Sequence, residues 1–309
     1  MVTYLLIFSV FDSTLLLFIS DRCFRNRIKR VSGINIRFVH IIEMSLLDRV
    51  AVVTGSSKGI GFEIASEFSK RGAIVIVCSR NLDQCKMAAA KINGITLALE
   101  VDVTDESSIK KFVNSILEKY KKIDILVNNS GYPYDETIWN KKIHEGSSDE
   151  LEKIIEVDLF GSVRLCRAVL PIMIQNSSAE SQSSNIPGAR VRNGGVIINI
   201  SSTPAISGRV GGFPYSIAKS GNITLTKCIA KEYSNFGIRA YTLALGNIAT
   251  LATLGSITEQ VIIKAALESP MKRWGKPSEV AKVAASLADD NFSYATGNTI
   301  VIDGGTVLI

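Results

Sequence analysis

The sequence predicts a single α/β domain built on a doubly wound, mostly parallel sheet with helices on both faces. Short runs of aliphatic and β-branched residues recur along the chain, for example at 50–54 and 196–200. Such runs are typical of strands that are buried on both faces. Helical periodicity separates the runs, which favours βαβ units and a parallel sheet. A glycine-rich turn follows the predicted strand at 49–54 and opens a helix.

The composition is that of a globular protein, and its charge requires no polyanionic partner. Hydrophobic residues make up 46% and charged residues 21% of the 309, which is enough for a sizeable core. The formal charge is +6, but residues 1–43 carry six basic and three acidic side chains and so supply half of it. The remaining +3 predicts no nucleic-acid partner, although a phosphorylated cofactor would suit it.

Cysteine and histidine usage argues against disulfides and metal sites. The five cysteines are odd in number and lack a C-x-x-C spacing, and there are only two histidines, His40 and His144. Free thiols persist in reducing compartments. The sequence therefore predicts free cysteines, a cytoplasmic protein and no metal site.

The first twenty residues leave three interpretations open. They are strongly apolar, and a basic run follows at 22–30. A secretory signal has its charge before the apolar stretch, so this order disfavours one. The stretch is long enough for a membrane anchor, but insertion of the Asp12 carboxylate near mid-span would cost roughly 2.5–3.5 kcal/mol. The third interpretation, which we prefer, is an extension outside the fold.

This preference sets the domain boundaries. Residues 1–45 form an N-terminal extension, and residues 46–309 form the cofactor-binding domain. Met44 directly precedes the lead-in to the first strand of that domain. We therefore expect Met44 to be the working start of the protein, or the extension to be dispensable.

The turn after the first strand has the composition of an anion site. A buried strand at 49–54 leads into G-S-S-K-G-I-G, and a helical pattern follows. Glycines let the backbone approach a pyrophosphate, and the N–H groups at a helix start point at it. The turn residues expected to contact a dinucleotide are Gly55, Ser57, Lys58, Gly59, Ile60 and Gly61.

A second stretch has the residues needed for proton transfer. A buried strand at 196–200 ends in two serines, and Tyr215 and Lys219 lie four residues apart in a predicted helix. They therefore share one face of that helix. A phenol has a pKa of about 10, and a nearby cation favours its ionised form. The Ser202 hydroxyl is placed to donate to a carbonyl oxygen that gains negative charge.

Together these motifs resemble the short-chain dehydrogenase/reductase family over residues 46–309. The resemblance rests on T-G-x-x-x-G-I-G, on N-N-S-G at 128–131 and on a serine thirteen positions before Y-x-x-x-K. Within the family, the chain is most similar to 3-oxoacyl-[acyl-carrier-protein] reductases. The resemblance implies a Rossmann-type fold and conversion between alcohols and carbonyls. It also implies a homo-oligomer, with a tetramer favoured, because the closing helix and last strand of relatives commonly pack subunits together.

The resemblance assigns roles to individual residues. The catalytic set that it implies is Ser202, Tyr215, Lys219 and Asp158. Beyond the glycine turn, the cofactor contacts that it implies are Arg80, Asp102, Val103, Asn129, Gly131, Ile248 and Thr250, together with Tyr215 and Lys219.

The cofactor expected is NADP(H) rather than NAD(H). Relatives that prefer NAD commonly carry an acidic residue at the position of Ser79, which accepts bonds from the ribose hydroxyls. Here Arg80 follows Ser79 and Lys58 lies in the glycine turn. Two cations without an acid favour a 2′-phosphate.

Two positions depart from the family pattern. Asp158 stands where most relatives have the fourth catalytic residue, an asparagine, and Leu245 replaces a proline in the turn before Ile248. A carboxylate near Lys219 would pair with it and weaken its effect on Tyr215. The alternative is a solvated helix residue, which apolar neighbours disfavour. The departures bear on rate and pH optimum rather than on reaction class.

Three connections complete the interpretation. Residues 132–148 form a long polar and aromatic link that borders the site, and 149–173 carry a long helical pattern. Residues 176–195 are predicted to be a mobile surface loop without chemistry. Residues 251–270 are short for a substrate cover, which fits a small or extended substrate.

The function expected is hydride transfer between NADP(H) and the carbonyl or alcohol carbon of a small molecule, with a 3-oxoacyl thioester as one candidate. A sugar or polyol dehydrogenase is an alternative within the same family. A catalytically weak NADP(H)-binding sensor is an alternative of another class, favoured by Asp158 and Leu245. Turnover of a carbonyl panel with NADPH and NADH distinguishes the three.

Overall fold

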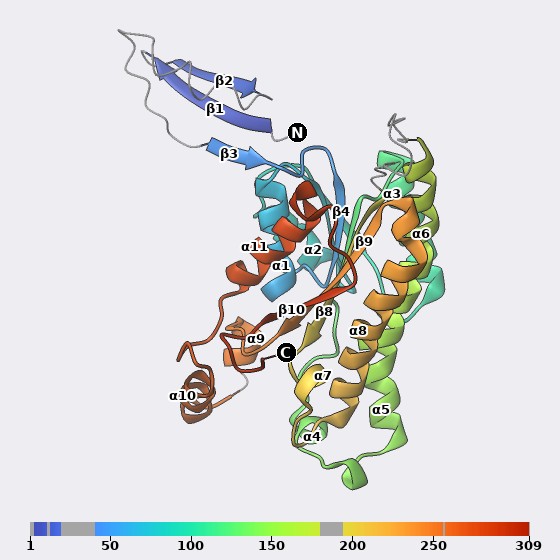
Figure 1. Ribbon diagram of the computed structural model, residues 1–309, viewed down its shortest axis with the longest axis vertical. Helices are drawn as coiled ribbons and strands as arrows, with labels where there is room; N and C mark the ends of the chain where they lie inside the picture. The colour runs from blue at the N-terminus through green and yellow to red at the C-terminus, as the bar shows by residue number, and fades with distance from the viewer. Residues whose placement is uncertain (1–2, 11–12, 20–40, 180–193, 256, 309) are drawn as a thin grey trace.

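The core of the molecule is a seven-stranded parallel sheet (Figure 1). The computed structural model describes residues 3–10, 13–19, 41–179, 194–255 and 257–308. In spatial order the strands are β10 (Asn298–Ile302), β9 (Ile238–Leu245), β8 (Gly195–Ser202), β7 (Ile125–Asn128), β4 (Val50–Thr54), β5 (Ile74–Ser79) and β6 (Thr96–Glu100). Every neighbouring pair is parallel, which confirms the predicted fold class.

The central strands consist almost entirely of buried residues. All five residues of β4 are buried, and β9 is buried along its whole length. Parallel strands carry such continuous apolar sequences because helices cover both faces of the sheet. This explains why the strands were visible in the sequence as aliphatic runs.

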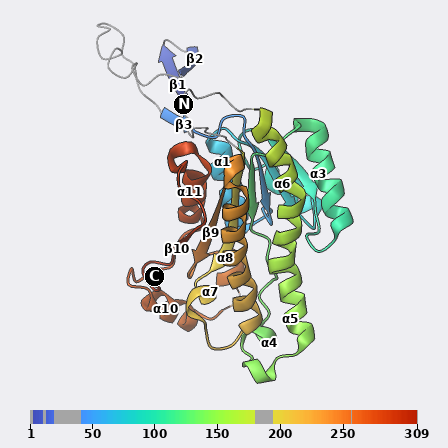
Figure 2. The ribbon, with the colours of Figure 1, turned by 45° about the vertical axis from the view of Figure 1, so that its right-hand side comes forward.

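Two groups of helices cover the two faces of the sheet (Figures 1 and 2). On one face lie α1 (Gly59–Lys70), α2 (Leu82–Ala89) and α11 (Pro277–Ala288), which share one hydrophobic cluster with the sheet. On the other lie α3 (Glu106–Tyr120), α6 (Gly161–Ala179) and α8 (Phe213–Tyr233), which share a second cluster. The molecule therefore has three layers.

The topology creates one switch point in the sheet. From β4 the chain moves outward through β5 to β6, and it then returns to β7 on the other side of β4. The carboxyl ends of β4 and β7 therefore lie side by side, and their connections leave in opposite directions. Open α/β sheets bind ligands at such a point.

Short elements surround the carboxyl ends of β7, β8 and β9. They are α4 (Glu136–Trp139), a 3-10 turn (Ile143–Glu145), α5 (Ser148–Ile155), a π-helical turn (Glu156–Phe160), α7 (Pro204–Ser207), α9 (Leu251–Leu254) and α10 (Glu259–Glu268). Two further 3-10 turns, Ser234–Phe236 and Asp290–Phe292, lie at the opposite end.

The described part of the N-terminal segment contains strands. β1 (Thr3–Val10) pairs antiparallel with β2 (Ser13–Ile19) and with β3 (Ile41–Met44), and the three form a sheet of their own. Among the described residues, no helix has the length and apolar character that crossing a membrane requires.

Three expectations about element boundaries are corrected. The helical pattern at 149–173 is interrupted by the π-helical turn, which gives α5 and α6 instead of one helix. Residues 176–179 belong to α6 and not to a loop, while 180–193 lie outside the described residues. The apolar run before Asp102 predicts that this residue closes the third strand, but β6 ends at Glu100.

Candidate active site

The glycine-rich turn lies at the switch point, where only glycine fits at one position. A Cβ atom on Gly61 would lie 2.5 Å from the Asn129 side-chain nitrogen and 2.7 Å from the Gly55 carbonyl oxygen. Gly55 and Gly59 have φ angles of +64° and +61°, in the left-handed region that glycine tolerates best. The turn after β4 and the turn after β7 therefore touch.

The start of α1 is suited to an anion. Lys58 is the N-cap and makes no side-chain capping bond, and the first turn of the helix contains no acidic residue. The first N–H groups of the helix therefore have no side-chain acceptor at the cap, and they can donate to a phosphate. Ser57 is half-buried and Lys58 is exposed beside them.

Two hydroxyl groups that the sequence analysis missed hold this turn in place. The Ser56 hydroxyl donates to the Val53 carbonyl at 2.6 Å and accepts from the Cys78 amide at 3.0 Å. The Thr54 hydroxyl accepts from the amides of Asn129 and Ser130, each at 2.9 Å. Their only sequence signal is a small hydroxyl residue at a strand end, which is common in any turn.

Asn129 also supports the turn rather than facing away from it. Its side-chain amide donates to the Thr54 carbonyl oxygen at 2.8 Å. This bond ties the end of β7 to the end of β4 across the switch point. Asn129 therefore holds the glycine turn in place, and its predicted contact with the cofactor stays a prediction.

The residues predicted to contact the adenosine half of the cofactor differ in whether their side chains already have partners in the protein. Arg80 is exposed just after β5, and neither it nor Lys58 forms an ion pair with a described residue. One Asp102 carboxylate oxygen accepts from the Thr104 amide at 2.9 Å and from its hydroxyl at 2.7 Å. The Val103 side chain packs against Gly161, where a Cβ atom would lie 2.7 Å away. Only the main chain of Val103 therefore remains for a ligand.

The sequence analysis also missed a carboxylate near this point. Glu100 in β6 is paired in register with Ser79 in β5, and its side chain is exposed. An acid therefore lies on the neighbouring strand although none occupies the Ser79 position itself. Sequence alone does not give this pairing, because it depends on the strand register.

On the nicotinamide side, Thr250 lies across from the glycine turn. Its methyl group would be 3.8 Å from a Cβ atom on Gly59, and its hydroxyl caps α9 by accepting from the Thr253 amide at 3.0 Å. Ile248 is 6% exposed and forms a main-chain bridge to Gly275. As with Val103, only the backbone of Ile248 is open to a cofactor.

The structure brings Tyr215 and Lys219 together at the carboxyl end of β8. Helix α8 begins at Phe213 with Pro214 in its first turn, as predicted, and Pro is pre-organised for that position. The Lys219 ammonium lies 5.5 Å from the centre of the Tyr215 ring and donates to the Ile200 carbonyl at 3.3 Å.

Ser202 closes β8 beside this pair. The neighbouring Ser201 hydroxyl donates to the Lys219 carbonyl oxygen at 2.8 Å, which fixes α8 against the strand end. The Ser202 hydroxyl itself donates to the Leu245 carbonyl at 3.1 Å. To hold a substrate oxygen, it must exchange that bond for a new one.

Asp158 forms a buried ion pair with Lys219. One carboxylate oxygen lies 2.7 Å from the ammonium nitrogen, and the two residues are 1% and 5% exposed. Burial lowers the pKa of Lys219, but attraction to Asp158 and Tyr215 and the bond to Asp158 outweigh it, so the pKa lies above its usual value. The alternative of a solvated Asp158 is wrong.

An aromatic stack borders Tyr215. The Trp139 ring lies 4.4 Å from the Tyr215 ring and 5.4 Å from the Tyr134 ring, measured between centroids. The Arg209 guanidinium lies over the Trp139 ring, 4.8 Å from its centroid. The long link at 132–148 thus reaches Tyr215. Its aromatic composition was the only signal in the sequence.

Buried amides and hydroxyls connect the site to the sheet. The Asn128 amide donates to Asn199 at 2.8 Å, the Asn199 amide donates to Thr226 at 2.8 Å, and Thr226 accepts from Thr242 at 2.7 Å. These residues come from β7, β8, α8 and β9. They fix the height of α8 on the sheet, and with it the position of Lys219.

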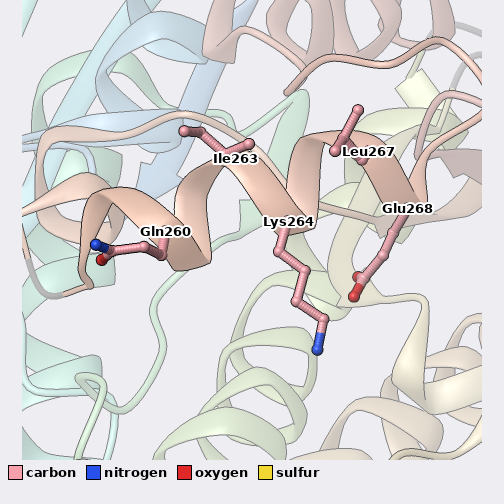
Figure 3. A pocket seen from close by; sticks show the side chains of 5 residues that line it. All are labelled: Gln260, Ile263, Lys264, Leu267 and Glu268. Atoms are coloured by element: carbon pink, nitrogen blue, oxygen red, sulfur yellow. The ribbon is translucent and has the colours of Figure 1, made fainter.

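A separate hollow of about 460 Å³ lies on α10 (Figure 3). In Figure 3, Ile263 and Leu267 project from one side of the helix, and Lys264 and Glu268 from the other. All residues that line this hollow come from α10, and none belongs to the catalytic or cofactor sets. It therefore adds nothing to the chemistry at the switch point.

Comparisons with known proteins agree with this geometry. A family model described as enoyl-(acyl carrier protein) reductase matches residues 55–307. A 3-oxoacyl-[acyl-carrier-protein] reductase of Thermotoga maritima is 35% identical, covering 86% of this chain and all of the relative. Glucose 1-dehydrogenase 2 of Bacillus subtilis is 33% identical, covering 85% of this chain and 96% of the relative.

A solved structure shares the fold as well. It comes from Agrobacterium tumefaciens, is provisionally assigned as a gluconate dehydrogenase, and matches with a TM-score of 0.74 and 27% identity. The match covers 86% of this chain and 99% of the solved one. The chain belongs to the short-chain dehydrogenase/reductase family, and it is an oxidoreductase that acts on CH–OH or carbonyl groups with a nicotinamide cofactor.

Proposed function

We propose that the protein interconverts a small or extended carbonyl compound and its alcohol with NADP(H). The observation that carries this proposal is the meeting of Tyr215 and Lys219 at the carboxyl end of β8, the strand that neighbours β7 at the switch point of the sheet. The nicotinamide, when bound, supplies or accepts the hydride. The chain itself has to bind, orient and move a proton.

The residues at the switch point fit a dinucleotide. The backbone of 55–61 approaches closely because Gly61 admits no side chain, and the first N–H groups of α1 lack a side-chain cap. These groups would hold the pyrophosphate. Asp102 would hold the adenine, and Thr250 with the backbone of Ile248 would hold the nicotinamide amide.

Tyr215 would pass the proton to or from the substrate oxygen. Ser202 would hold that oxygen by a hydrogen bond, in place of its present bond to Leu245. Lys219 would favour the phenolate and hold the nicotinamide ribose. Lowering a phenol pKa from about 10 to near 7 requires ~4 kcal/mol of differential interaction, which a close ammonium can largely supply.

The preference for NADP(H) rests on charge. Arg80 and Lys58 are exposed, and each is free of a carboxylate partner within the described part of the chain. A 2′-phosphate would give both a partner, whereas Ser79 offers no carboxylate to the ribose hydroxyls. Glu100, beside Ser79 in the sheet, acts against this preference.

A 3-oxoacyl thioester is the first substrate class to test. The relative from Thermotoga maritima is named as a 3-oxoacyl-[acyl-carrier-protein] reductase. The cover of the site is slight, because none of the residues of α9 and α10 is buried. An extended acyl chain needs less enclosure than a bulky substrate. Sugars and polyols are the alternative, since other relatives are named for glucose and gluconate.

A catalytically weak NADP(H)-binding sensor is the second candidate function. Asp158 engages the lysine that the reaction needs, and Leu245 stands in place of the usual turn proline. Such a protein would bind NADPH tightly and turn over no carbonyl.

Three further proposals accompany the function. The extension at 1–45 is dispensable, so expression from Met44 should yield a soluble and active protein. The protein is cytoplasmic, a proposal supported by its four described cysteines, all free thiols. It forms a homo-oligomer, with a tetramer favoured, which sedimentation would measure.

The deciding experiment is a carbonyl panel run with NADPH and with NADH. The panel should contain 3-oxoacyl thioesters, aldoses and simple ketones, and oxidation of the cofactor is followed by absorbance. Faster oxidation of NADPH with the thioesters is the expected result. Tight NADPH binding without turnover of any compound would favour the sensor, and no binding of either cofactor would reject both functions.

A further inference from the structure

Asp158 occupies an unusual place in the fold. It lies in the π-helical turn Glu156–Phe160, which separates α5 from α6. Such turns are rare and frequently occur at functional sites. Its main-chain carbonyl accepts from the Asn222 side chain at 2.8 Å, which joins the turn to α8 one turn beyond Lys219.

The Asp158 carboxylate has a partner on each side. One oxygen lies 2.7 Å from the Lys219 ammonium, and the other accepts from the Tyr132 amide at 2.7 Å. The same carboxylate lies beside Gly131, where a Cβ atom would be 3.1 Å away. Asp158 therefore joins α8 to the turn that follows β7. A neutral amide in its place can accept only through its oxygen.

The contacts of Lys219 show how much of its charge remains for other partners. An ammonium group has three N–H donors. One donates to the Ile200 carbonyl, and the ammonium also forms the ion pair with Asp158, so only part of its charge and donor capacity remains for a ribose hydroxyl or for the phenol. The Asp158 carboxylate oxygen lies 2.7 Å from the ammonium nitrogen, and at this separation Coulomb attraction between opposite charges is strong.

We infer that Asp158 is a positioning residue: its carboxylate anchors Lys219 and offsets the ammonium charge, so that Tyr215 ionises at a more alkaline pH than it would with asparagine at position 158. This inference rests on the proposed role of Tyr215 only for its effect on catalysis. The effect on ionisation of the phenol is independent of any reaction.

The other charged groups around Tyr215 do not replace this effect. Tyr132 follows β7 and packs in the same apolar cluster, and the Arg209 guanidinium lies over the Trp139 ring, 4.8 Å from its centroid. Helix α7 and strand β8, which also pack on α8, carry no charged residue. On α5, Glu150 pairs with Lys141, and the remaining charged residues are exposed, namely Asp149, Glu152 and Lys153.

The test is an ultraviolet titration of tyrosinate in the protein without cofactor or substrate. The signal of Tyr215 is isolated by subtracting the titration of the Tyr215→Phe variant in each background. Asp158→Asn is nearly isosteric and should lower the midpoint of Tyr215 by at least one pH unit. The pH profile of kcat should move by the same amount. An unchanged midpoint would overturn the inference.

A matched control and a double-mutant cycle sharpen the test. Glu156→Gln removes a carboxylate from the same π-helical turn, but one that pairs with Arg164 at 2.6 Å, and it should leave the midpoint unchanged. In a Lys219→Gln background, Asp158→Asn should shift the midpoint much less. An undiminished shift there would mean that Asp158 acts on the phenol directly, which would refute its action through Lys219.

These readouts separate this inference from the proposed function. If Tyr215→Phe retains turnover while Asp158→Asn still moves the tyrosinate midpoint, then the assigned proton donor is wrong but the role of Asp158 stands. If Tyr215→Phe is inactive and Asp158→Asn does not move the tyrosinate midpoint, then the assigned proton donor stands and the role inferred for Asp158 is wrong.

Discussion

The two sides of the switch point are held together by different forces. On the cofactor side, the glycine turn is fixed by neutral bonds from Thr54, Ser56 and Asn129. On the catalytic side, the contact between α8 and the π-helical turn contains a buried ion pair, Asp158 with Lys219, in addition to the neutral bond from Asn222. Neutral bonds are insensitive to pH between about 5 and 9, whereas charges set the protonation of their neighbours. Substitutions in the glycine turn should therefore alter cofactor binding, whereas substitutions at the ion pair should alter turnover and its pH dependence.

The largest effect is expected from Tyr215→Phe, which removes the proposed proton donor and leaves the glycine turn unchanged. Loss of the proton donor should lower kcat by roughly 10²–10⁴-fold, the range for general acid–base catalysis. The dissociation constant for NADPH, measured by fluorescence titration, should change less than about twofold, since the fold of the glycine turn is untouched. The control is Tyr233→Phe at the other end of α8. Substantial turnover in Tyr215→Phe would remove Tyr215 from the mechanism.

Gly61→Ala should break the cofactor side. The new methyl group would lie 2.5 Å from the Asn129 nitrogen and 2.7 Å from a backbone oxygen, so the turn must move. We expect at least about a tenfold weaker affinity for NADPH, equivalent to about 1.4 kcal/mol. Tyrosinate titration of Tyr215 should be unaffected. Ser66→Ala, further along α1, serves as the control, and unchanged NADPH affinity in Gly61→Ala would contradict the assigned phosphate site.

Arg80→Ala should distinguish the binding of NADPH from the binding of NADH. Loss of one charge-assisted bond to the 2′-phosphate should weaken NADPH binding by about tenfold. NADH binding should not change, because NADH lacks that phosphate. Isothermal titration with both cofactors measures the ratio, and Lys91→Ala on the surface nearby is the control. Equal losses for NADPH and NADH would mean that Arg80 does not read the phosphate.

The smallest effect concerns the pH dependence of stability on the catalytic side. The pKa of Lys219 is raised in the folded protein, so its stabilising contribution is complete below the unfolded value of about 10.4 and is lost as the pH rises through the folded value. The difference in Tm between the wild type and Asp158→Asn should therefore decrease by a few degrees once the pH exceeds the pKa of Lys219 in the folded protein. A constant difference across the alkaline range would contradict this.

The exposed pair between Arg273 and Glu279 is the matched reference for that measurement. Its atoms are also 2.7 Å apart, but both side chains are more than 40% exposed. Exposed pairs contribute about 0–1 kcal/mol. Glu279→Gln should therefore change Tm little at neutral pH, and its effect should not depend on alkaline pH.

Local patterns gave most of the fold and part of the site. The strand β8, the start of α8 and the spacing of Tyr215 from Lys219 all follow from periodicity within a few residues. The glycine turn was equally accessible, because a strand before it and a helix after it are also local features. The pairing of Asp158 with Lys219 was foreseen only as one alternative.

What the sequence did not predict depends on contacts between distant segments. Trp139 stacks on Tyr215 across 76 positions of the chain, and Ser202 finds its acceptor at Leu245 in the next strand. The inward orientation of the Val103 and Ile248 side chains likewise depends on packing against α6 and the core. No periodicity encodes such contacts, since they follow from strand order and helix placement.

The position of Trp139 gives the molecule an optical reporter of its own. The chain contains only two indoles, Trp139 and Trp274, and the second lies elsewhere, where its ring nitrogen donates to the Ile262 carbonyl. Because the first stacks on Tyr215, we expect its emission to change when the phenol changes charge or when a ligand binds beside it. A single-indole variant, Trp274→Phe, would make ligand entry visible without any label.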